Sequence, residues 1–204
     1  DGSRIAYVRC QADAATDAYA STLWLLDLAS GEALCLGAGS APRWSPDGRW
    51  LALLRDDAAG CRQVWLWSPG VDAAPTALTD AGEPASGVAW SPDSRQLAFV
   101  RRVPEPARAS MPRDPRWAAP GIYSEALVRR VEGIDGELPA GHHQVFVLDL
   151  ASRALRQVTD GPFDHGGPRT SITKLSVGGQ ISWSPDGHGL VMALNRTAPP
   201  AGPH

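Results

Sequence analysis

Cysteine is scarce in this 204-residue sequence, and long apolar runs are absent. The three cysteines, Cys10, Cys35 and Cys61, are an odd number at wide spacings that match neither a zinc site nor a disulfide framework. We interpret them as ordinary thiols, which favours a reducing, cytoplasmic compartment. The apolar stretch 23–26 ends at Asp27, far short of the ~20 residues that cross a bilayer, so we expect no membrane partner.

Charge of one sign is not in excess either. Nineteen basic residues face 22 acidic ones, and no basic block is present that would attract nucleic acid. Clusters at metal-ligand spacing are also lacking, since the adjacent His142 and His143 would point to opposite faces of a strand. We expect no nucleic-acid partner, no metal and no other cofactor. The 43% of hydrophobic residues are enough to bury a globular core.

One twelve-residue pattern occurs three times. It reads WSPDGRWLALLR from Trp44, WSPDSRQLAFVR from Trp90 and WSPDGHGLVMAL from Trp183. A shorter copy, DGSRIAYVR, starts at Asp1 and aligns with the stretch from Asp47, so the sequence begins inside a repeat. The first three units continue into the apolar runs TLWLLDLASGE, QVWLWSPG and QVFVLDLASRA, and then close in Leu-Gly or in Leu/Val-Thr-Asp. A complete unit therefore has four short segments.

The repeated Ser-Pro-Asp-Gly sequence predicts a hairpin turn. Proline presets the backbone angle of the second turn position, serine can bond a nearby amide, and glycine tolerates the positive angle that lets a strand resume. Ser94 replaces this glycine in the second full copy. We assign a structural role in the repeat, and no catalytic one, to Trp44, Ser45, Pro46, Asp47, Gly48, Trp90, Ser91, Pro92, Asp93, Trp183, Ser184, Pro185, Asp186 and Gly187.

The segments after the turn predict strands that are covered on both faces. Residues 51–54 and 97–100 are too short for stable helices and too continuously apolar for a sheet with one face in water. Four-stranded antiparallel sheets stacked face to face around an axis meet this requirement, and a period of about 40–45 residues is typical of propellers. We predict an all-β fold, a β-propeller segment of about three to four blades out of seven.

The spacing of the repeats sets the expected boundaries. They give a partial blade at 1–40, blades at 41–86 and 87–178, and a partial blade at 179–204, with 13 strands in all. Trp44 and Trp90 are 46 residues apart, whereas Trp90 and Trp183 are 93 apart. The 47 extra residues map to two enlarged loops, at about 102–143 and 161–179. Because neither end is a cap, we expect a segment of a longer protein.

The repeats carry a family resemblance. The WSPDG turn, the LAFVR and VFVLDL strands and the closing LTD resemble the propeller repeats shared by TolB-like proteins and the prolyl oligopeptidase family of serine peptidases. The stretch from Tyr123 to Leu150 is similar to acylaminoacyl-peptidase-like members, although Glu132 stands where an aspartate is more usual. The resemblance implies a propeller that limits access by size to a C-terminal α/β-hydrolase domain, which cleaves short or N-blocked peptides. It is also compatible with a homo-oligomer.

No catalytic residue is expected within this sequence. No serine stands in the Gly-x-Ser-x-Gly pattern of a nucleophile elbow, so the hydrolase domain lies outside the chain and the segment alone is expected to be inert. His165 begins an HGGP stretch that resembles part of an oxyanion hole. Because a propeller repeat returns at Trp183, we interpret it as a loop.

The candidate substrate-binding residues are Arg129, Arg130 and Glu132 in the first enlarged loop. The seven arginines from Arg101 to Arg130 and the six acids of this loop are near balance, which favours a solvated, self-paired surface. The alternative is that these three residues line the central cavity and bind a peptide terminus, because arginine can hold a carboxylate through two hydrogen bonds.

Two alternatives stay open. The chain could be a stand-alone TolB-like propeller that serves as a periplasmic scaffold for protein partners. The eight tryptophans could also form a sugar-binding surface, but Trp44, Trp90 and Trp183 recur at one repeat position and Trp24 and Trp65 at another, which favours packing between sheets. Three tryptophans do not follow this pattern, namely Trp50, Trp67 and Trp117.

Overall fold

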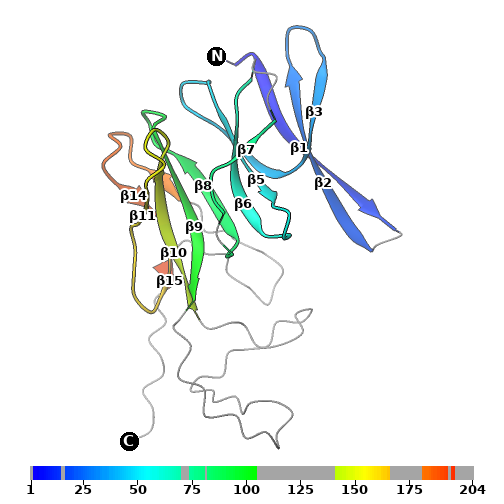
Figure 1. Cartoon of the computed structure of the whole chain (residues 1–204). Helices are drawn as coiled ribbons and strands as arrows, with labels where there is room; N and C mark the ends of the chain where they lie inside the picture. Colours follow the sequence, from blue (N-terminus) through cyan, green and yellow to red (C-terminus); the bar gives the residue numbers. More distant parts are fainter. Residues whose placement is uncertain are drawn as a thin grey trace, which may run out of the picture.

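The computed structural model describes residues 2–14, 17–69, 74–80, 82–104, 141–165, 181–192 and 194–195. All regular secondary structure in these ranges is β-strand, arranged in antiparallel sheets that follow one another along the chain (Figure 1). None of the described residues form a helix that is long and apolar enough to cross a membrane.

The first sheet has three strands in sequence order. They are β1 (Arg4–Asp13), β2 (Ala18–Asp27) and β3 (Ala33–Ala38). β1 pairs with β2 over its whole length, from Arg4 opposite Asp27 to Asp13 opposite Ala18. This sheet corresponds to the second, third and fourth segments of a repeat unit, because β1 begins just after the short copy of the turn.

The next two sheets have four strands each. One contains β4 (Ser40–Trp44), β5 (Leu51–Asp56), β6 (Arg62–Trp67) and β7 (Thr76–Ala77). The other contains β8 (Ala85–Trp90), β9 (Gln96–Pro104), β10 (Gly141–Asp149) and β11 (Leu155–Gln157). Figure 1 shows the three sheets side by side in chain order, and β8 packs against β4, β5 and β6. The predicted four-stranded antiparallel sheets are confirmed.

Two short strand pairs follow. β13 (Ser182–Trp183) pairs with β14 (Leu190–Val191), as the last repeat predicts. β12 (Asp164–His165) pairs with β15 (Leu194–Asn195), which the sequence analysis did not predict because it assigned 161–179 to a loop. These two strands are the only additions to the 13 expected ones within the described residues.

The core lies between the sheets, so the inner strands of the two four-stranded sheets are buried on both faces. Leu51 and Leu53 pack towards the first sheet with Leu23, whereas Ala52 and Leu54 pack towards the third. These four of the six β5 residues are at most 5% exposed. Alternate side chains of a strand point to opposite faces. The continuous apolar run is therefore explained by a sheet between two neighbours.

The same internal hydrogen bonds stabilise the repeated turn in each of the three full copies. In the first copy the Ser45 hydroxyl donates to Asp47 Oδ1 at 2.5 Å and accepts from the Trp50 N–H at 2.9 Å. The Gly48 N–H donates to the Ser45 carbonyl at 2.9 Å. The turns at Ser91 and Ser184 repeat these three bonds. Sidechain-to-backbone bonds of this kind fix a turn locally, which explains why the same residue types return in every unit.

A bulge also recurs in the first strand of each four-stranded sheet. The pairing of β4 with β5 shifts between Ser40 and Arg43, and that of β8 with β9 shifts between Ser86 and Ala89. Ala41 has a φ of 49° and Gly87 a φ of 63° at these shifts. Positive φ is the backbone signature of such a bulge. It is a feature of the repeat that the sequence did not reveal, because alanine is an unfavourable residue there.

The first enlarged loop is shorter than predicted. β9 and β10 stay paired as far as Gly141 opposite Pro104, so the expected loop at 102–143 loses residues at both ends to the ladder. His142 and His143 lie opposite Val103 and Arg102 and are strand residues. The additional pairing extends the hairpin beyond the copied strand, and Val103 in this extension still packs against the core between the second and third sheets.

Candidate functional site

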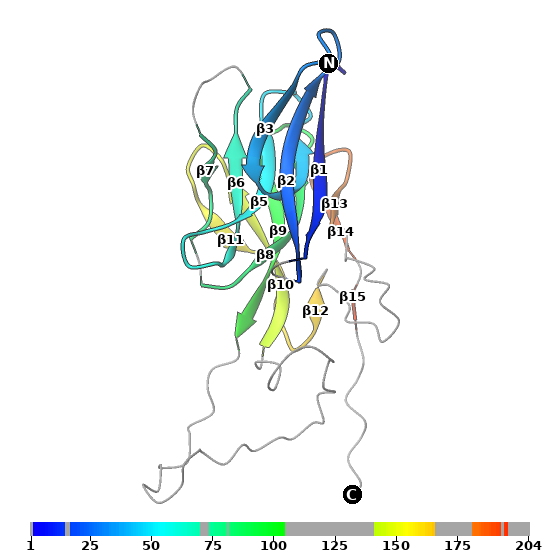
Figure 2. The ribbon, with the colours of Figure 1, turned by 90° about the vertical axis from the view of Figure 1, so that its right-hand side faces the viewer.

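A charged cluster lies at the end of the hairpin formed by β9 and β10. We call it the hairpin-end cluster, and it consists of Glu83, Arg101, Arg102, His142, His143 and Asp164. Figure 2 shows the ends of β9 and β10 and the strand β12 at the same end of the molecule. This is where the chain leaves for and returns from residues 105–140.

Arg102 and Glu83 form a two-point ion pair. Arg102 Nη2 lies 2.8 Å from Glu83 Oε1, and Arg102 Nε lies 3.0 Å from Glu83 Oε2. Their side chains are only 20% and 25% exposed. Paired planar groups of this kind add geometric specificity to the charge attraction. The pair therefore ties the segment before β8 to the far end of β9.

The guanidinium group of Arg101 stacks on an aromatic ring of its own sheet. Its guanidinium carbon lies 4.4 Å from the centre of the Phe146 ring, within cation–π range. Burial lowers the pKa of Arg101, while the carboxylates of Glu83 and Asp80 oppose that shift. Arginine nevertheless stays charged at neutral pH, so this cation is a fixed positive charge beside the hairpin end.

The stacked arginine is a repeat position that the sequence analysis missed. Arg9 lies 5.7 Å from the Trp24 ring and Arg55 lies 5.6 Å from the Trp65 ring, in the same places of the first two sheets. Arg55 also donates to the carbonyls of Leu36 and Ala38, both at 2.6 Å. The arginine that ends three of the four copies of the pattern, at Arg9, Arg55 and Arg101, is the signal that could have found it. Arg101 therefore belongs to the scaffold and not to the enlarged loop.

Two histidines surround one carboxylate in the hairpin-end cluster. The backbone N–H of His143 donates to Asp164 Oδ1 at 2.8 Å, and the His143 ring Nδ1 lies 3.2 Å from the same oxygen. The His142 ring Nδ1 is 3.9 Å from that oxygen. These contacts join β10 to β12. Within the described residues no group of three or more histidine, cysteine or carboxylate side chains is placed to hold a metal ion.

The residues proposed from the sequence to contact substrate lie outside the described ranges. These are Arg129, Arg130 and Glu132, and their position in a cavity stays a prediction. Of the HGGP stretch, only His165 is described, in β12, with its ring Nδ1 3.1 Å from the Phe163 carbonyl oxygen. The hairpin end is thus the described part of the molecule nearest in sequence to the predicted site.

The tryptophans of the repeat donate hydrogen bonds to backbone carbonyls and pack between the sheets. Trp90 donates its indole N–H to the Arg43 carbonyl at 2.9 Å, and Trp65 donates to the Arg55 carbonyl at 3.0 Å. Trp67 is 8% exposed and belongs to the core between the first two sheets, and Trp50 packs against the next core. The packing role therefore extends to two tryptophans that the repeat pattern had left unassigned.

No protein-family model matches the sequence. The chain is 27% identical over 202 residues to "Uncharacterized peptidase YuxL" of Bacillus subtilis (strain 168), an alignment that covers 97% of this chain and 28% of that protein. The chain thus spans little more than a quarter of the length of the curated relative that it matches.

Superposition on solved structures identifies the fold formed by the stacked sheets. The acylaminoacyl peptidase of Pyrococcus horikoshii superposes with a TM-score of 0.57 at 18% identity, over 83% of this chain and 27% of that one. The β-propeller domain of the trilobed protease from Pyrococcus furiosus gives 0.51 at 15% identity, over 84% and 47%. A putative TolB from Agrobacterium tumefaciens gives 0.51 at 18% identity, over 93% and 53%. The fold is that of a β-propeller.

The sheets are therefore propeller blades, as the repeats predicted. β1–β3 form a three-stranded sheet, and β4–β7 and β8–β11 form two four-stranded blades. The hairpin-end cluster lies at one end of the third sheet, and its Arg101 stacks on Phe146 of the core between this sheet and its neighbour. Such an end of a rigid propeller is a place where loops of variable length can be carried without disturbing the blades.

Proposed function

We propose that this propeller segment is the non-catalytic, substrate-gating part of a serine peptidase that cleaves short or N-blocked peptides. The observation that carries the proposal is the alignment with a protein named as a peptidase over 97% of this chain. The structural likeness to propellers of peptidases supports it, as does the absence of a nucleophile elbow from the sequence. The catalytic α/β-hydrolase domain would belong to the same protein, in the cytoplasm.

The proposed blade limits are those of the repeats. They are a partial blade at 1–40, blades at 41–86 and 87–178, and a partial blade at 179–204. In a ring of such blades, rigid walls would admit a peptide of limited size to the hydrolase. The rigidity has a physical basis in the doubly buried inner strands and in the turns that close on themselves.

The peptidase proposal is tested by labelling the intact protein with a serine-directed phosphonate. We expect the full-length protein to react and the 204-residue segment to remain unlabelled, because the segment carries no nucleophile elbow. A folded full-length sample that does not react would contradict the peptidase proposal.

The gating role is tested by shortening the loop between β9 and β10. Pro104 and Gly141 lie directly opposite each other, so residues 105–140 can be replaced by Asn-Gly, which closes a two-residue hairpin. In the intact protein we expect faster cleavage of long peptides and unchanged cleavage of dipeptide-sized substrates. An unchanged dependence of rate on peptide length would remove the loop from the gate.

Peptide binding by Arg129, Arg130 and Glu132 is part of the same proposal. Replacing both arginines with alanine in the intact protein should raise KM for peptides with a free carboxylate and leave the matching amides unaffected, because the lost group binds the carboxylate. The control is Arg95→Ala/Arg156→Ala, which removes two exposed arginines of the same blade. Equal kinetics in both double variants would contradict the assignment.

A TolB-like scaffold is the second candidate, favoured by the superposition that covers 93% of this chain. This alternative places the protein in the periplasm, with protein partners in place of peptide substrates. It predicts no phosphonate labelling of the intact protein, so the same experiment distinguishes the two.

A further inference from the structure

β12 and β13 pair with one short segment, residues 190–195, although they are far apart in the sequence. His165 of β12 lies opposite Leu194, and Ser182 of β13 lies opposite Val191, in both cases antiparallel. The two partner residues are three positions apart, whereas His165 and Ser182 are seventeen positions apart. Sixteen residues of the chain therefore separate two pairings that are close neighbours along the partner segment.

The third sheet contains the same pairing without an interruption. Ala85 of β8 lies opposite Arg101, and Ala89 lies opposite Ala98, again three positions apart on the partner strand. Only the three residues 86–88 separate Ala85 from Ala89, and the register shift of the bulge falls among them. Compared with β8, the last repeat thus has thirteen additional residues, inserted at the place where the bulge recurs.

The chain that leads into β12 keeps the spacing of a first strand. Thr159 and Thr79 hold equivalent positions, since each donates its hydroxyl to a buried glutamine of the third strand, at 2.8 Å and 2.6 Å respectively. His165 follows Thr159 by six residues, as Ala85 follows Thr79. His165 therefore lies where the first strand of the next blade is expected.

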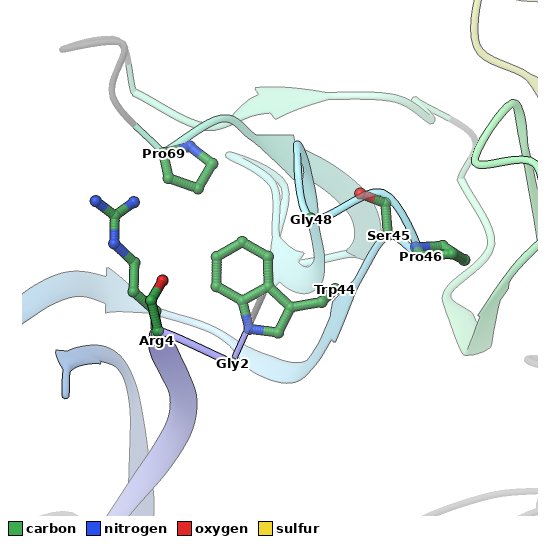
Figure 3. A pocket seen from close by; sticks show the side chains of 8 residues that line it. Gly2, Arg4, Trp44, Ser45, Pro46, Gly48 and Pro69 are labelled. Atoms are coloured by element: carbon green, nitrogen blue, oxygen red, sulfur yellow. The ribbon is translucent and has the colours of Figure 1, made fainter.

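The chain after the insertion also continues as a first strand. Ile181 is 7% exposed in the core between the third sheet and the last repeat, and Val88 is 7% exposed in the core between the second and third sheets. Two residues later each strand reaches its repeat tryptophan, which for β13 is Trp183. Figure 3 shows this strand end in the second sheet, where Trp44 lies beside the repeated turn that follows it.

β12 is in addition fastened to the preceding blade. Asp164 Oδ1 accepts the backbone N–H of His143 at 2.8 Å. The side-chain amide of Gln144 donates to the carbonyls of Gly161 at 2.9 Å and Phe163 at 3.3 Å. These donors belong to β10 of the third sheet, whereas the ladder partner of β12 is β15 of the last repeat. β12 therefore connects two successive blades.

The insertion leaves the blade at the edge where successive first strands meet. β8 contacts β4 on one side and β13 on the other, and the indoles of Trp90 and Trp183 bond back to the preceding first strand. The fourth strands β7 and β11 lie at the opposite edge of their sheets and are exposed. Propeller blades surround a central channel, so the edge at which first strands meet is the one that faces it.

We propose that β12 and β13 are the two halves of one first strand, split at the bulge by residues 167–179. Asp164 is the positioning residue that holds the first half against β10. The last blade then includes Asp164 and His165, ahead of the limit at 179 that the repeats give. The blade does not need the inserted residues, so their removal should leave an uninterrupted first strand.

The first experiment removes the insertion from the intact protein. Deletion of residues 167–179 joins Gly166 to position 180, and Gln180→Gly supplies the residue type that the bulge has at Gly87, whose φ is 63°. Hydrogen exchange is measured by mass spectrometry on peptides that cover β12 and β15. We expect exchange there to slow by about tenfold, because the loop closed by the two pairings becomes much shorter.

The matched control deletes residues 163–175, which are equal in number but include β12. In this variant we expect exchange of β15 to accelerate, because its ladder partner is gone. If deletion of 167–179 instead accelerates exchange of β15 while β5 stays protected, the proposal is wrong. If the shortened protein does not fold, a thirteen-residue Gly-Ser sequence replaces 167–179. Protection of β12 in that variant supports the split strand, and loss of protection or of folding disproves it.

The second experiment tests Asp164 in the protein of natural length. Asp164→Ala should accelerate exchange of β12 by about tenfold, because the His143 N–H loses its acceptor, while β13 and β14 stay protected. Asp164→Asn keeps an oxygen acceptor for that N–H and should restore most of the protection. Equal exchange in the alanine and asparagine variants, or an acceleration that extends to β5, would exclude Asp164 as the positioning residue.

Discussion

The hydroxyl of Ser94 accepts a hydrogen bond of 3.1 Å from the backbone N–H of Asp47, which joins the turns of two adjacent blades. Ser94 stands where the other copies have glycine, and its φ of 62° is one that side chains disfavour. Its side chain is nevertheless 7% exposed and bonded across the blade boundary. Serine at this position therefore costs backbone strain within the turn but provides a hydrogen bond between the two blades.

This relationship predicts a specific order of stabilities. Ser94→Ala keeps the unfavourable φ and loses the bond, so we expect the free energy of unfolding to fall by about 1 kcal/mol. Ser94→Gly also loses the bond but removes a backbone strain of roughly 1–2 kcal/mol, so we expect it to be more stable than Ser94→Ala. Urea unfolding of the three proteins measures both differences. If the glycine variant is the less stable of the two, the strain argument is wrong.

The bulge in β4 predicts a stabilising glycine. Ala41 has a φ of 49°, and Gly87 occupies the same position of the next blade with a φ of 63°. Ala41→Gly should therefore raise the free energy of unfolding by about 1 kcal/mol, because the strain removed exceeds the entropy cost of glycine. Ala52→Gly in the regular strand β5 is the control and should destabilise. A thermal melt in which both variants lose stability would refute the role of the bulge.

The repeated turn predicts how stability depends on pH. The Ser45, Ser91 and Ser184 hydroxyls are the main cause of the lowered pKa values of Asp47, Asp93 and Asp186. A carboxyl whose pKa is lower in the folded chain stabilises the fold above its unfolded pKa of about 3.9. That contribution is lost as the pH falls through the lower folded value. We therefore expect the free energy of unfolding to decrease below about pH 4.

Removing a turn hydroxyl should weaken this dependence. Ser45→Ala raises the pKa of Asp47 because the carboxylate loses its closest donor, so the decrease in stability with acid becomes shallower. Carboxyl ¹³C NMR titration of Asp47 and urea unfolding at several pH values give the two readouts. Ser68→Ala is the control, because that hydroxyl donates to the Arg49 carbonyl. A pKa of Asp47 that is the same in Ser45→Ala and the natural chain would contradict the assignment.

The Arg102–Glu83 pair predicts a measurable coupling energy. A double-mutant cycle with Arg102→Met and Glu83→Gln should give about 1 kcal/mol at low salt, since the pair is bidentate and partly buried. Salt screens charge pairs, so the coupling should decrease in 1 M NaCl. The exposed pair Arg62–Asp56, at 3.4 Å, is the comparison and should couple more weakly. Equal couplings for the two pairs would show that burial and geometry add nothing here.

Gly141 is predicted to be irreplaceable at the hairpin end. Its φ is 142°, and a Cβ there would lie 2.5 Å from the Val103 carbonyl oxygen. Gly141→Ala must therefore separate β9 from β10 at this end, and we expect amide exchange at His142 and Val103 to accelerate. The buried core residues Leu97, Phe99, Phe146 and Leu148 lie farther along the two strands and should remain protected. Unchanged exchange at both residues would show that the hairpin end absorbs the methyl group.

Elements whose cause is local could be predicted from the sequence. The turn at Ser45 is closed by bonds that span at most five residues, so the residues that make it stand together in the sequence. The apolar run at 51–54 indicated a strand buried on both faces, because only stacked sheets can cover it. The predicted contacts of Arg129 and Arg130 had no comparable local signal, and they remain predictions.

Several features followed from the tertiary structure alone. The partner of the Trp90 indole is 47 residues away and that of Trp183 is 94 residues away. The hydrogen bond from Asp47 to Ser94 and the pairing of β12 with β15 likewise connect residues that are far apart in the sequence. The burial of Trp67 also depends on the packing of separate elements. The chain by itself determined its turns, strands and blade period, because these depend on residues close in sequence. Stacking determined which side chains meet between blades, because such contacts exist only once two sheets are packed together.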